Sequence, residues 1–432
     1  MTALIYTLGV LVFVVGVIVS IALHEVGHLY PAKKFGVKVT QYFVGFGNTV
    51  WSTRRGETEY GLKSIPLGGY VKLVGMLPPE KEQDPATVRD SNTGLFTQLA
   101  ADARHAEYET ITEADQDRLF YKLPWWKKVI VMAGGPMVNV AISVVLFAIV
   151  LMGFGMLTPT TTVAGVSDCA ITDAEAGRAC TDEDPVTPAR QAGIVPGDRI
   201  VAFNGEQITS WEQLTGLIRG NSDREATIVI ERDGQRIAEQ VPTTVIPRVS
   251  LEDPERTEEV GFLGVEPVQE QVRQGPVVVG EVMWGQVQAT AEAIARLPVR
   301  MVDVTRAAFG AERPNDGPIS VVGASRVAGE LVTINEPTWA ERAQRLMMLL
   351  ASLNLFLALF NFVPLLPLDG GHIAGAIWEG LKRGWARMWG RPDPGPVDVA
   401  RMLPVAYAVG GILIIMSVIL IYADIVNPVR LS

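Results

Sequence analysis

Four long apolar blocks constrain this chain more than any other feature of its sequence. Each block reaches the roughly 20 residues that a helix needs to cross the hydrocarbon layer of a membrane. The 432 residues are 48% hydrophobic and 19% charged, and a single soluble core does not gather its apolar residues in this way. The pattern predicts four membrane-spanning helices, in blocks 4–23, 138–157, 346–366 and 403–423.

The basic residues predict how these helices are oriented. Lys33 and Lys34 follow the first block, Lys127 and Lys128 precede the second, and five basic residues separate the third from the fourth. Because cytoplasmic connections are enriched in lysine and arginine, we expect both connections in the cytoplasm and both termini outside. The first block has neither a basic leader nor a small-residue cleavage site, so we expect a retained span rather than a signal peptide.

The long segment between the second and third blocks carries the acidity of the chain. Residues 158–345 hold 29 acidic and 17 basic side chains, a balance of −12, while the whole chain has a net charge of −10. This balance predicts an acidic exterior domain and gives no indication of a nucleic-acid partner. Cys169 and Cys180 both lie at its start, where an oxidising compartment would permit a disulfide; two free thiols remain an equal alternative.

Local patterns divide the rest of the chain. Residues 36–77 alternate apolar and polar side chains between glycines, which is typical of β-hairpins. Strand and helix patterns after residue 190 indicate an α+β domain, and an apolar stripe over 285–310 indicates an amphipathic helix that packs or lies on the membrane. The predicted segments are a first transmembrane helix (1–35), membrane-associated β-hairpins (36–77), a cytoplasmic polar loop (78–124), a second transmembrane helix (125–157), an exterior domain (158–250), exterior strands and helix (251–345), a third transmembrane helix (346–380), a cytoplasmic loop (381–402) and a fourth transmembrane helix (403–426).

The sequence His24-Glu25-Val26-Gly27-His28 closes the first apolar block. Residues four apart share one face of a helix, so both imidazoles can reach one zinc ion, and the glutamate between them can act as a general base. Ionisable side chains next to an uncharged span are usually paired or bound to a ligand. The alternative is that the helix has ended and these residues lie among lipid headgroups.

A catalytic zinc ion needs a third protein ligand and one open position. Asp369 follows the third block in Pro364-Leu365-Leu366-Pro367-Leu368-Asp369-Gly370-Gly371-His372, where prolines and glycines interrupt the helix. The first and third spans both run from outside to inside, so Asp369 should reach the same leaflet as His24 and His28. His372 is a rival ligand, and we favour Asp369.

These motifs occur in the order seen in bacterial site-2 proteases, which the chain resembles over essentially its whole length. The resemblance rests on 24–28, 65–73, 133–139 and 354–371. It implies an intramembrane zinc metallopeptidase in which Glu25 is the base, and it supports Asp369 at the metal. It also implies that Asn361 positions substrate or stabilises the oxyanion, and Pro364 is expected to help position substrate. Relatives cut membrane-anchored anti-sigma factors after a first exterior cleavage, so such proteins are the expected partners, in a bacterial cell membrane.

The exterior domain contributes a second resemblance. Gly193, Ile194, Gly197 and Asp198 lie in a run that is similar to the carboxylate-binding region of a PDZ domain. One such copy is evident, whereas some relatives carry two. The complete expectation is a polytopic α-helical membrane protein with four transmembrane helices, cytoplasmic membrane-associated β-hairpins and an exterior α+β PDZ-like domain.

Substrate handling can also be anticipated from the sequence. The amides of a helical substrate already form hydrogen bonds within their own segment, so a strand edge near Gly68 and Gly69 could receive the unwound chain by β-augmentation. The exterior domain could filter substrates by size or bind a new carboxyl terminus. Two other functions remain open: a membrane-tethered PDZ adaptor, which needs no zinc, and a metal transporter, which would place histidines and an aspartate within spans.

Overall fold

The structure is a computed structural model that divides the chain into two compact units. One unit comprises Met1–Gly153 and Gly275–Ser432, and the other comprises Phe154–Gln274. The described residues are 2–79, 111–172, 178–181, 183–222, 224–250, 256–311, 313, 317–335 and 337–429. Most of the predicted polar loop (78–124), including His105, therefore lies outside the described residues.

Four helical segments of the first unit are long and apolar enough to cross a membrane, as predicted. Their outer faces are apolar: Ile414 and Val418, for example, are 67% and 60% exposed. Water would solvate such surfaces poorly, whereas hydrocarbon would not, so these faces are suited to a bilayer. The segments are α1 (Thr2–Lys34), α3 (Trp125–Ala148) with the π-helical turn Ile149–Phe154, α8 (Trp339–Asn361), and α10 (Leu403–Val426) preceded by the 3₁₀ turn Val399–Met402.

Helices α1 and α3 cross at glycines. A side chain at Gly27 would clash with the carbonyl of Gly134, and a side chain at Gly134 would clash with the carbonyl of Gly27. Small residues let two helix backbones approach closely within a membrane, where packing rather than the hydrophobic effect drives helix association. Gly27 lies inside the histidine motif, so this close crossing brings α3 directly against it.

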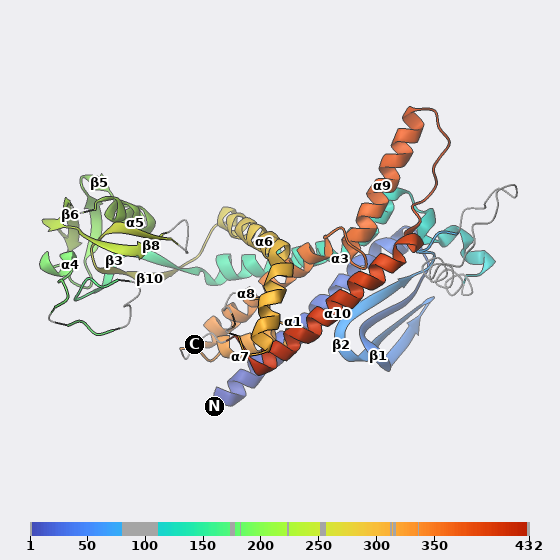
Figure 1. Cartoon of the computed structure of the whole chain (residues 1–432), viewed down its shortest axis with the longest axis horizontal. Helices are drawn as coiled ribbons and strands as arrows, with labels where there is room; N and C mark the ends of the chain where they lie inside the picture. The colour runs from blue at the N-terminus through green and yellow to red at the C-terminus, as the bar shows by residue number, and fades with distance from the viewer. Residues whose placement is uncertain are drawn as a thin grey trace. The chain divides into compact units, whose positions relative to one another are not determined.

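The strands β1 (Val39–Arg55) and β2 (Thr58–Leu73) form a two-stranded sheet that packs beside α1 (Figure 1). Strand β2 passes β1 on both sides, as the pairing of Val44 with both Leu62 and Gly69 of β2 shows. A core of buried apolar side chains joins the sheet to α1 and α3. The Tyr42 hydroxyl donates a hydrogen bond of 2.8 Å to the Ala22 carbonyl, and burial raises the pKa of Tyr42 to about 12, so this donor remains protonated.

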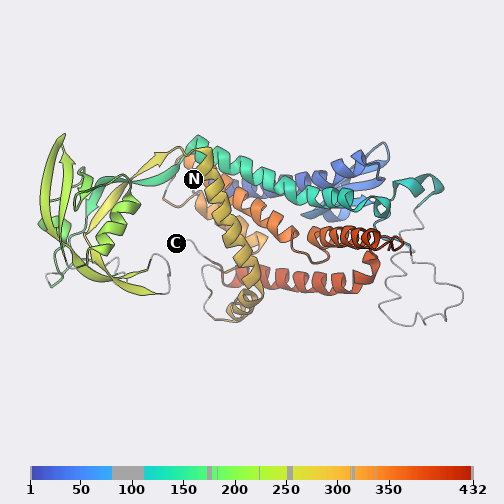
Figure 2. The same cartoon turned by 90° about the horizontal axis from the view of Figure 1, so that it is seen from above.

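The third apolar region is two helices rather than one continuous span. Helix α8 begins after Thr338, whose side chain caps it, and ends at Asn361; α9 (Asp369–Met388) begins after a short loop (Figure 2). The prediction that residues 381–402 form a loop was therefore wrong for its first part. Pro364 and Pro367 cannot donate backbone hydrogen bonds, which stops α8, and good helix formers after Gly371 allow a new helix.

Three further elements contact the C-terminal part of α10. Helix α6 (Pro276–Ala308) begins earlier than the predicted 285–310 and packs its last turns against Ala423 of α10. Its first turns remain largely exposed, with Trp284 at 63%. Helix α7 (Val321–Leu331) follows a connection in which Arg313 forms a buried ion pair of 2.6 Å with Asp424 of α10. This pair ties the end of α10 to the α6–α7 connection.

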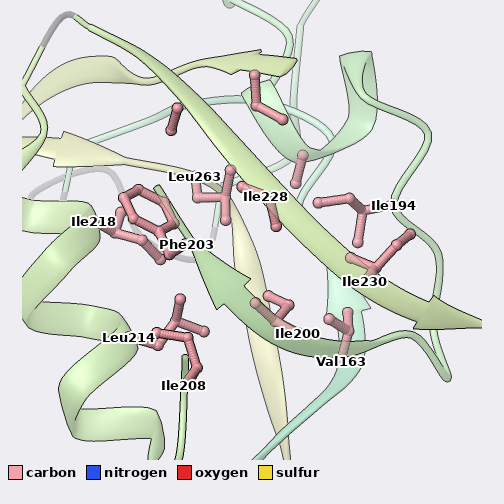
Figure 3. Close-up of a cluster of buried hydrophobic side chains, with 13 residues drawn as sticks. Val163, Ile194, Ile200, Phe203, Ile208, Leu214, Ile218, Ile228, Ile230 and Leu263 are labelled. Atoms are coloured by element: carbon pink, nitrogen blue, oxygen red, sulfur yellow. The ribbon is translucent and has the colours of Figure 1, made fainter. Parts of the chain in front are cut away.

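The second unit is built around a β-sheet with strand order β10-β3-β4-β6-β7, in which β5 also pairs with β4. Strands β8 and β9 form a separate pair. The core lies between the sheet and α5, where Phe203, Leu214 and Ile228 are almost fully buried (Figure 3). The elements are β3 (Met156–Val166), α4 (Pro188–Gln191), β4 (Arg199–Phe203), β5 (Glu206–Gln207), α5 (Trp211–Gly220), β6 (Glu225–Arg232), β7 (Gln235–Pro242), β8 (Thr244–Val249), β9 (Thr257–Phe262) and β10 (Val265–Val272).

Two polar features secure this unit. Cys169 and Cys180 form a disulfide, which decides between the two alternatives that the sequence allowed. The fully buried carboxylate of Asp198 accepts hydrogen bonds from the Arg232 guanidinium and from the Val195 amide. These bonds, chiefly those from Arg232, hold the pKa of Asp198 below its usual range. Asp198 therefore stays ionised and joins the loop before β4 to β6.

Candidate metal centre

The candidate metal centre begins on α1, close to the end of this helix that is predicted to lie toward the cytoplasm. His24 and His28 lie one helical turn apart and turn the same face toward α3 and the start of α9. Glu25 is 9% exposed and lies between them in sequence. The helix continues six residues past His28, to Lys34, so these side chains do not lie at a frayed helix end.

Asp369 meets both histidines although α8 and α9 lie far from α1 in the sequence. The Nε2 atoms of His24 and His28 are 3.2 Å apart, and each lies 3.4 Å from Asp369 Oδ2. Tetrahedral zinc with bonds of about 2.0–2.1 Å separates its ligands by roughly 3.4 Å. The three atoms therefore have the spacing of three zinc ligands.

The chemistry of these atoms also fits a cation. The Nδ1 atom of His28 lies 2.9 Å from the Val131 carbonyl, which can only accept, so Nδ1 carries the proton. In the neutral imidazole, which is the form that binds a metal, the Nε2 atom then presents a lone pair toward the carboxylate. Asp369 Oδ2 is buried and has no hydrogen-bond donor among the described residues. A lone pair and an anionic oxygen face each other favourably only across a positive charge.

Gly135 of α3 borders the same space. A Cβ atom at this position would clash with His28 Nε2 and lie 2.7 Å from His24 Nε2. The absence of a side chain on Gly135 therefore leaves room beside the two nitrogen atoms. Glycine is needed here for volume, since its backbone has an ordinary helical conformation.

On the other side, Gly69 of β2 lies against Glu25. A Cβ atom at Gly69 would lie 2.9 Å from Glu25 Cγ and 3.3 Å from Oε1. Residues 69–73 pair with residues 39–44 of β1, and no other described strand pairs with them. The other edge of residues 69–73 is thus free of a strand partner within the described chain, and Glu25 lies close to this strand at Gly69.

The other predicted residues occupy different positions. Gly68 has a φ of +96° and faces the Phe46 ring, and Asn361 donates a hydrogen bond of 3.0 Å to Leu357 within its own helix. Pro364 lies in the loop between α8 and α9. His372 is absent from the described metal-binding cluster, which comprises His24, His28 and Asp369.

In the second unit, a groove of about 400 Å³ lies between α5 and the end of β9. Trp211, Thr215 and Arg219 line it from α5, and residues 260–267 line it from the opposite side, with Arg248 on β8. The amides of Leu263 and Gly264 donate to no group in the described part of the chain.

The predicted carboxylate-binding residues lie elsewhere in this unit. Gly193, Ile194, Gly197 and Asp198 precede β4 and are not among the residues that line the groove. Ile194 belongs to the hydrophobic core, and Asp198 is occupied by Arg232. Their observed contacts are structural.

The site combines a glutamate with a cluster of three possible metal ligands, and it lies among apolar helices long enough to cross a membrane. These features are those of a membrane-embedded metallohydrolase. Comparison with known proteins narrows this class. The signature of peptidase family M50 matches residues 12–387. The chain belongs to this family, that of the site-2 proteases, and is accordingly a membrane protein and a zinc metalloprotease.

The similarity extends over complete relatives. The chain is 34% identical to the zinc metalloprotease Rip1 of Mycobacterium tuberculosis and 32% identical to that of Mycolicibacterium smegmatis, each over 99% of both chains. It is 28% identical to the metalloprotease MmpA of Caulobacter vibrioides over 86% of both chains. These names support zinc as the cofactor.

Sequence reasoning assigned no role in this centre to two of its contributors. The Val131 carbonyl orients His28, and Gly135 leaves space beside the ligand nitrogens. A carbonyl has no sequence signal. The run Gly134-Gly135-Pro136 within an apolar helix was a usable signal, because glycines are poor helix formers unless packing requires them.

We predict that Gly135→Ala lowers the zinc content of the purified full-length protein well below one ion per chain. The added methyl group would occupy the space beside His24 Nε2 and His28 Nε2. Metal analysis of detergent-purified protein measures this. The matched control is Gly153→Ala at the end of the same span, where a Cβ meets nothing within 4 Å. A fully zinc-loaded Gly135→Ala protein would contradict the prediction.

Proposed function

We propose that the protein is an intramembrane endopeptidase that hydrolyses peptide bonds in single-span membrane proteins. In this proposal His24, His28 and Asp369 hold the zinc ion and Glu25 is the general base. The observation that carries it is the 3.2–3.4 Å spacing of the three ligand atoms, with Glu25 on the same helix. Membership of a zinc metalloprotease family supports hydrolysis over the adaptor and transporter alternatives.

The zinc ion and Glu25 have different roles in the proposed hydrolysis. A bound zinc ion would lower the pKa of a coordinated water molecule and polarise the scissile carbonyl. Glu25 accepts the proton from the attacking water and passes it to the leaving amine. Its low exposure strengthens these electrostatic interactions, because little bulk water screens them.

Substrate would bind along the free edge of β2. A transmembrane helix must unwind before cleavage, and its released amides and carbonyls then need partners within the membrane. Residues 69–73 offer such partners by β-augmentation. Gly69 lets Glu25 approach this strand without an intervening side chain. Gly68, Asn361 and Pro364 are proposed to shape the path of the substrate.

The groove of the second unit is proposed to act as a PDZ-like receptor for a peptide carboxyl terminus. Two successive amides without acceptors in the described chain, at Leu263 and Gly264, match the donors that a carboxylate requires. Arg219 and Arg248 add positive charge, and Trp211 adds an apolar wall. We favour this function over a size filter, which needs no groove.

Orientation and substrates follow from the same reasoning. We propose that the termini and the second unit lie outside, and that the metal centre lies toward the cytoplasm of a bacterial cell membrane. The disulfide Cys169–Cys180 supports an oxidising exterior for the second unit. Membrane-anchored anti-sigma factors, already shortened by an exterior protease, are the proposed substrates.

Glu25→Gln should separate zinc binding from catalysis. We expect the variant to retain zinc and to cleave a single-span reporter at least about 100-fold more slowly, since it loses the general base. Metal analysis and reporter cleavage in proteoliposomes are measured on the same preparation. His24→Ala is the comparison variant and should lose both zinc and cleavage. Equal cleavage by Glu25→Gln and wild type would exclude the assigned role.

Gly69→Ala should slow cleavage by roughly 100-fold while zinc content stays unchanged. The methyl group would displace either Glu25 or the bound substrate strand, and a shift of about 1 Å can cost this much. Ser64→Ala, at an exposed position of the same strand outside residues 69–73, is the matched control. Wild-type cleavage by the glycine variant would argue against a substrate strand at this edge.

Thr215→Trp should fill the groove and abolish binding of a carboxyl-terminal peptide. We expect wild-type full-length protein to bind an apolar peptide with a free carboxylate at least about tenfold more tightly than its amidated form. Fluorescence anisotropy measures both affinities. Glu212→Trp, at an exposed position of α5 that does not line the groove, controls for added bulk. Binding that ignores the carboxylate would favour the size filter.

A further inference from the structure

Helix α9 carries an apolar face that nothing in the described chain covers. Its members are between 57% and 73% exposed, far more than core residues. They recur every three or four residues, so they share one face of the helix. We call this face the aromatic stripe; it comprises Trp378, Leu381, Trp385, Met388 and Trp389. Figure 1 shows the last turns of α9 reaching beyond the neighbouring helices.

The opposite side of α9 is firmly held. Glu379 is almost fully buried and accepts a hydrogen bond of 2.7 Å from Lys128 of α3. It also accepts one of 3.2 Å from the Val397 amide. The ring of Trp125 packs so closely on Gly380 that a Cβ there would lie 2.6 Å from it. These contacts fix the rotation of α9, so the aromatic stripe cannot turn inward.

The depth of the aromatic stripe follows from its distance to Trp125. Trp125 begins the second span with Trp126 and Lys127, the aromatic and basic residues that mark a membrane interface. A helix rises about 1.5 Å per residue, so Trp385 lies at most about 7.5 Å beyond Gly380. A headgroup layer is roughly 5–8 Å thick on each side of the hydrocarbon core. The later part of the stripe therefore reaches the headgroups.

Positive charge accompanies the aromatic stripe at this depth. Lys382, Arg387 and Arg391 form no ion pair within the described residues. The neighbouring Arg383, in contrast, is engaged by Glu379 and Asp393. Three available cations at about the depth of the later indole rings are complementary to anionic headgroups above an apolar layer. A zwitterionic surface would leave these charges without counter-charges.

We propose that the aromatic stripe, with Lys382, Arg387 and Arg391, is a docking surface for anionic phospholipids. The indole rings lie among the headgroups, and the three cations contact lipid phosphates. Because α9 begins with Asp369, lipid bound at its far end also steadies the helix that carries this candidate ligand. The inference goes beyond the proposed function, and its test does not depend on cleavage.

The test uses full-length protein reconstituted in vesicles that contain either brominated phosphatidylglycerol or brominated phosphatidylcholine at the same fraction. Bromine quenches tryptophans that it contacts. We expect stronger quenching by the anionic lipid, because each nearby basic residue strengthens such binding by on the order of fivefold. The excess should decline as salt is added. It should also disappear in the combined variant Lys382→Gln, Arg387→Gln and Arg391→Gln.

Two controls make the result specific. The combined variant Arg190→Gln, Arg236→Gln and Arg256→Gln removes three exposed charges from the second unit and should keep the excess. Trp385→Phe with Trp389→Phe should lose most of it, which locates the contact. Zinc content verifies that each variant is folded. Equal quenching of the wild type by both lipids, or an excess that persists without the three α9 charges, would overturn the proposal.

Discussion

The crossing of α1 and α3 at Gly27 and Gly134 is the contact on which the candidate metal centre depends. Two backbones that touch there bring the Val131 carbonyl within hydrogen-bond distance of His28. The same proximity requires glycine at position 135, because any side chain there would enter the space beside the histidine nitrogens. A larger residue at any of these glycines would push the helices apart or fill that space. The same glycines are therefore required both for the packing of α1 against α3 and for the positions of the candidate metal ligands.

Two buried ion pairs inside the first unit hold helices together. Lys128 and Glu379 join α3 to α9, and Arg313 and Asp424 join the α6–α7 connection to α10. A buried charge without its partner is costly, so each pair constrains where its helices can lie. For α9 the constraint also determines which face is turned outward. The aromatic stripe is thus exposed because the polar side of the helix is anchored.

Apolar periodicity and motif spacing carried much of the prediction. Four blocks of adequate length predicted four membrane-length helices, and the spacing of His24 and His28 predicted a shared helical face. The extent of α9 was missed, because a stop signal such as Pro364 marks where a helix ends but does not reveal how far a helix after it continues. The PDZ-like region illustrates another limit. Gly193 to Asp198 matched a motif, yet the groove formed where α5 and β9 approach each other.

By itself, the sequence determined which segments are apolar enough to leave water and which residue types are able to bind a metal. It did so because hydropathy and helical periodicity are local properties of the chain. Only the tertiary structure decided that Asp369 rather than His372 lies 3.4 Å from both histidines. It also decided that Gly69 meets Glu25 and that the indole of Trp385 is turned outward. These outcomes depend on how separate helices and strands pack, and a linear pattern does not contain those distances.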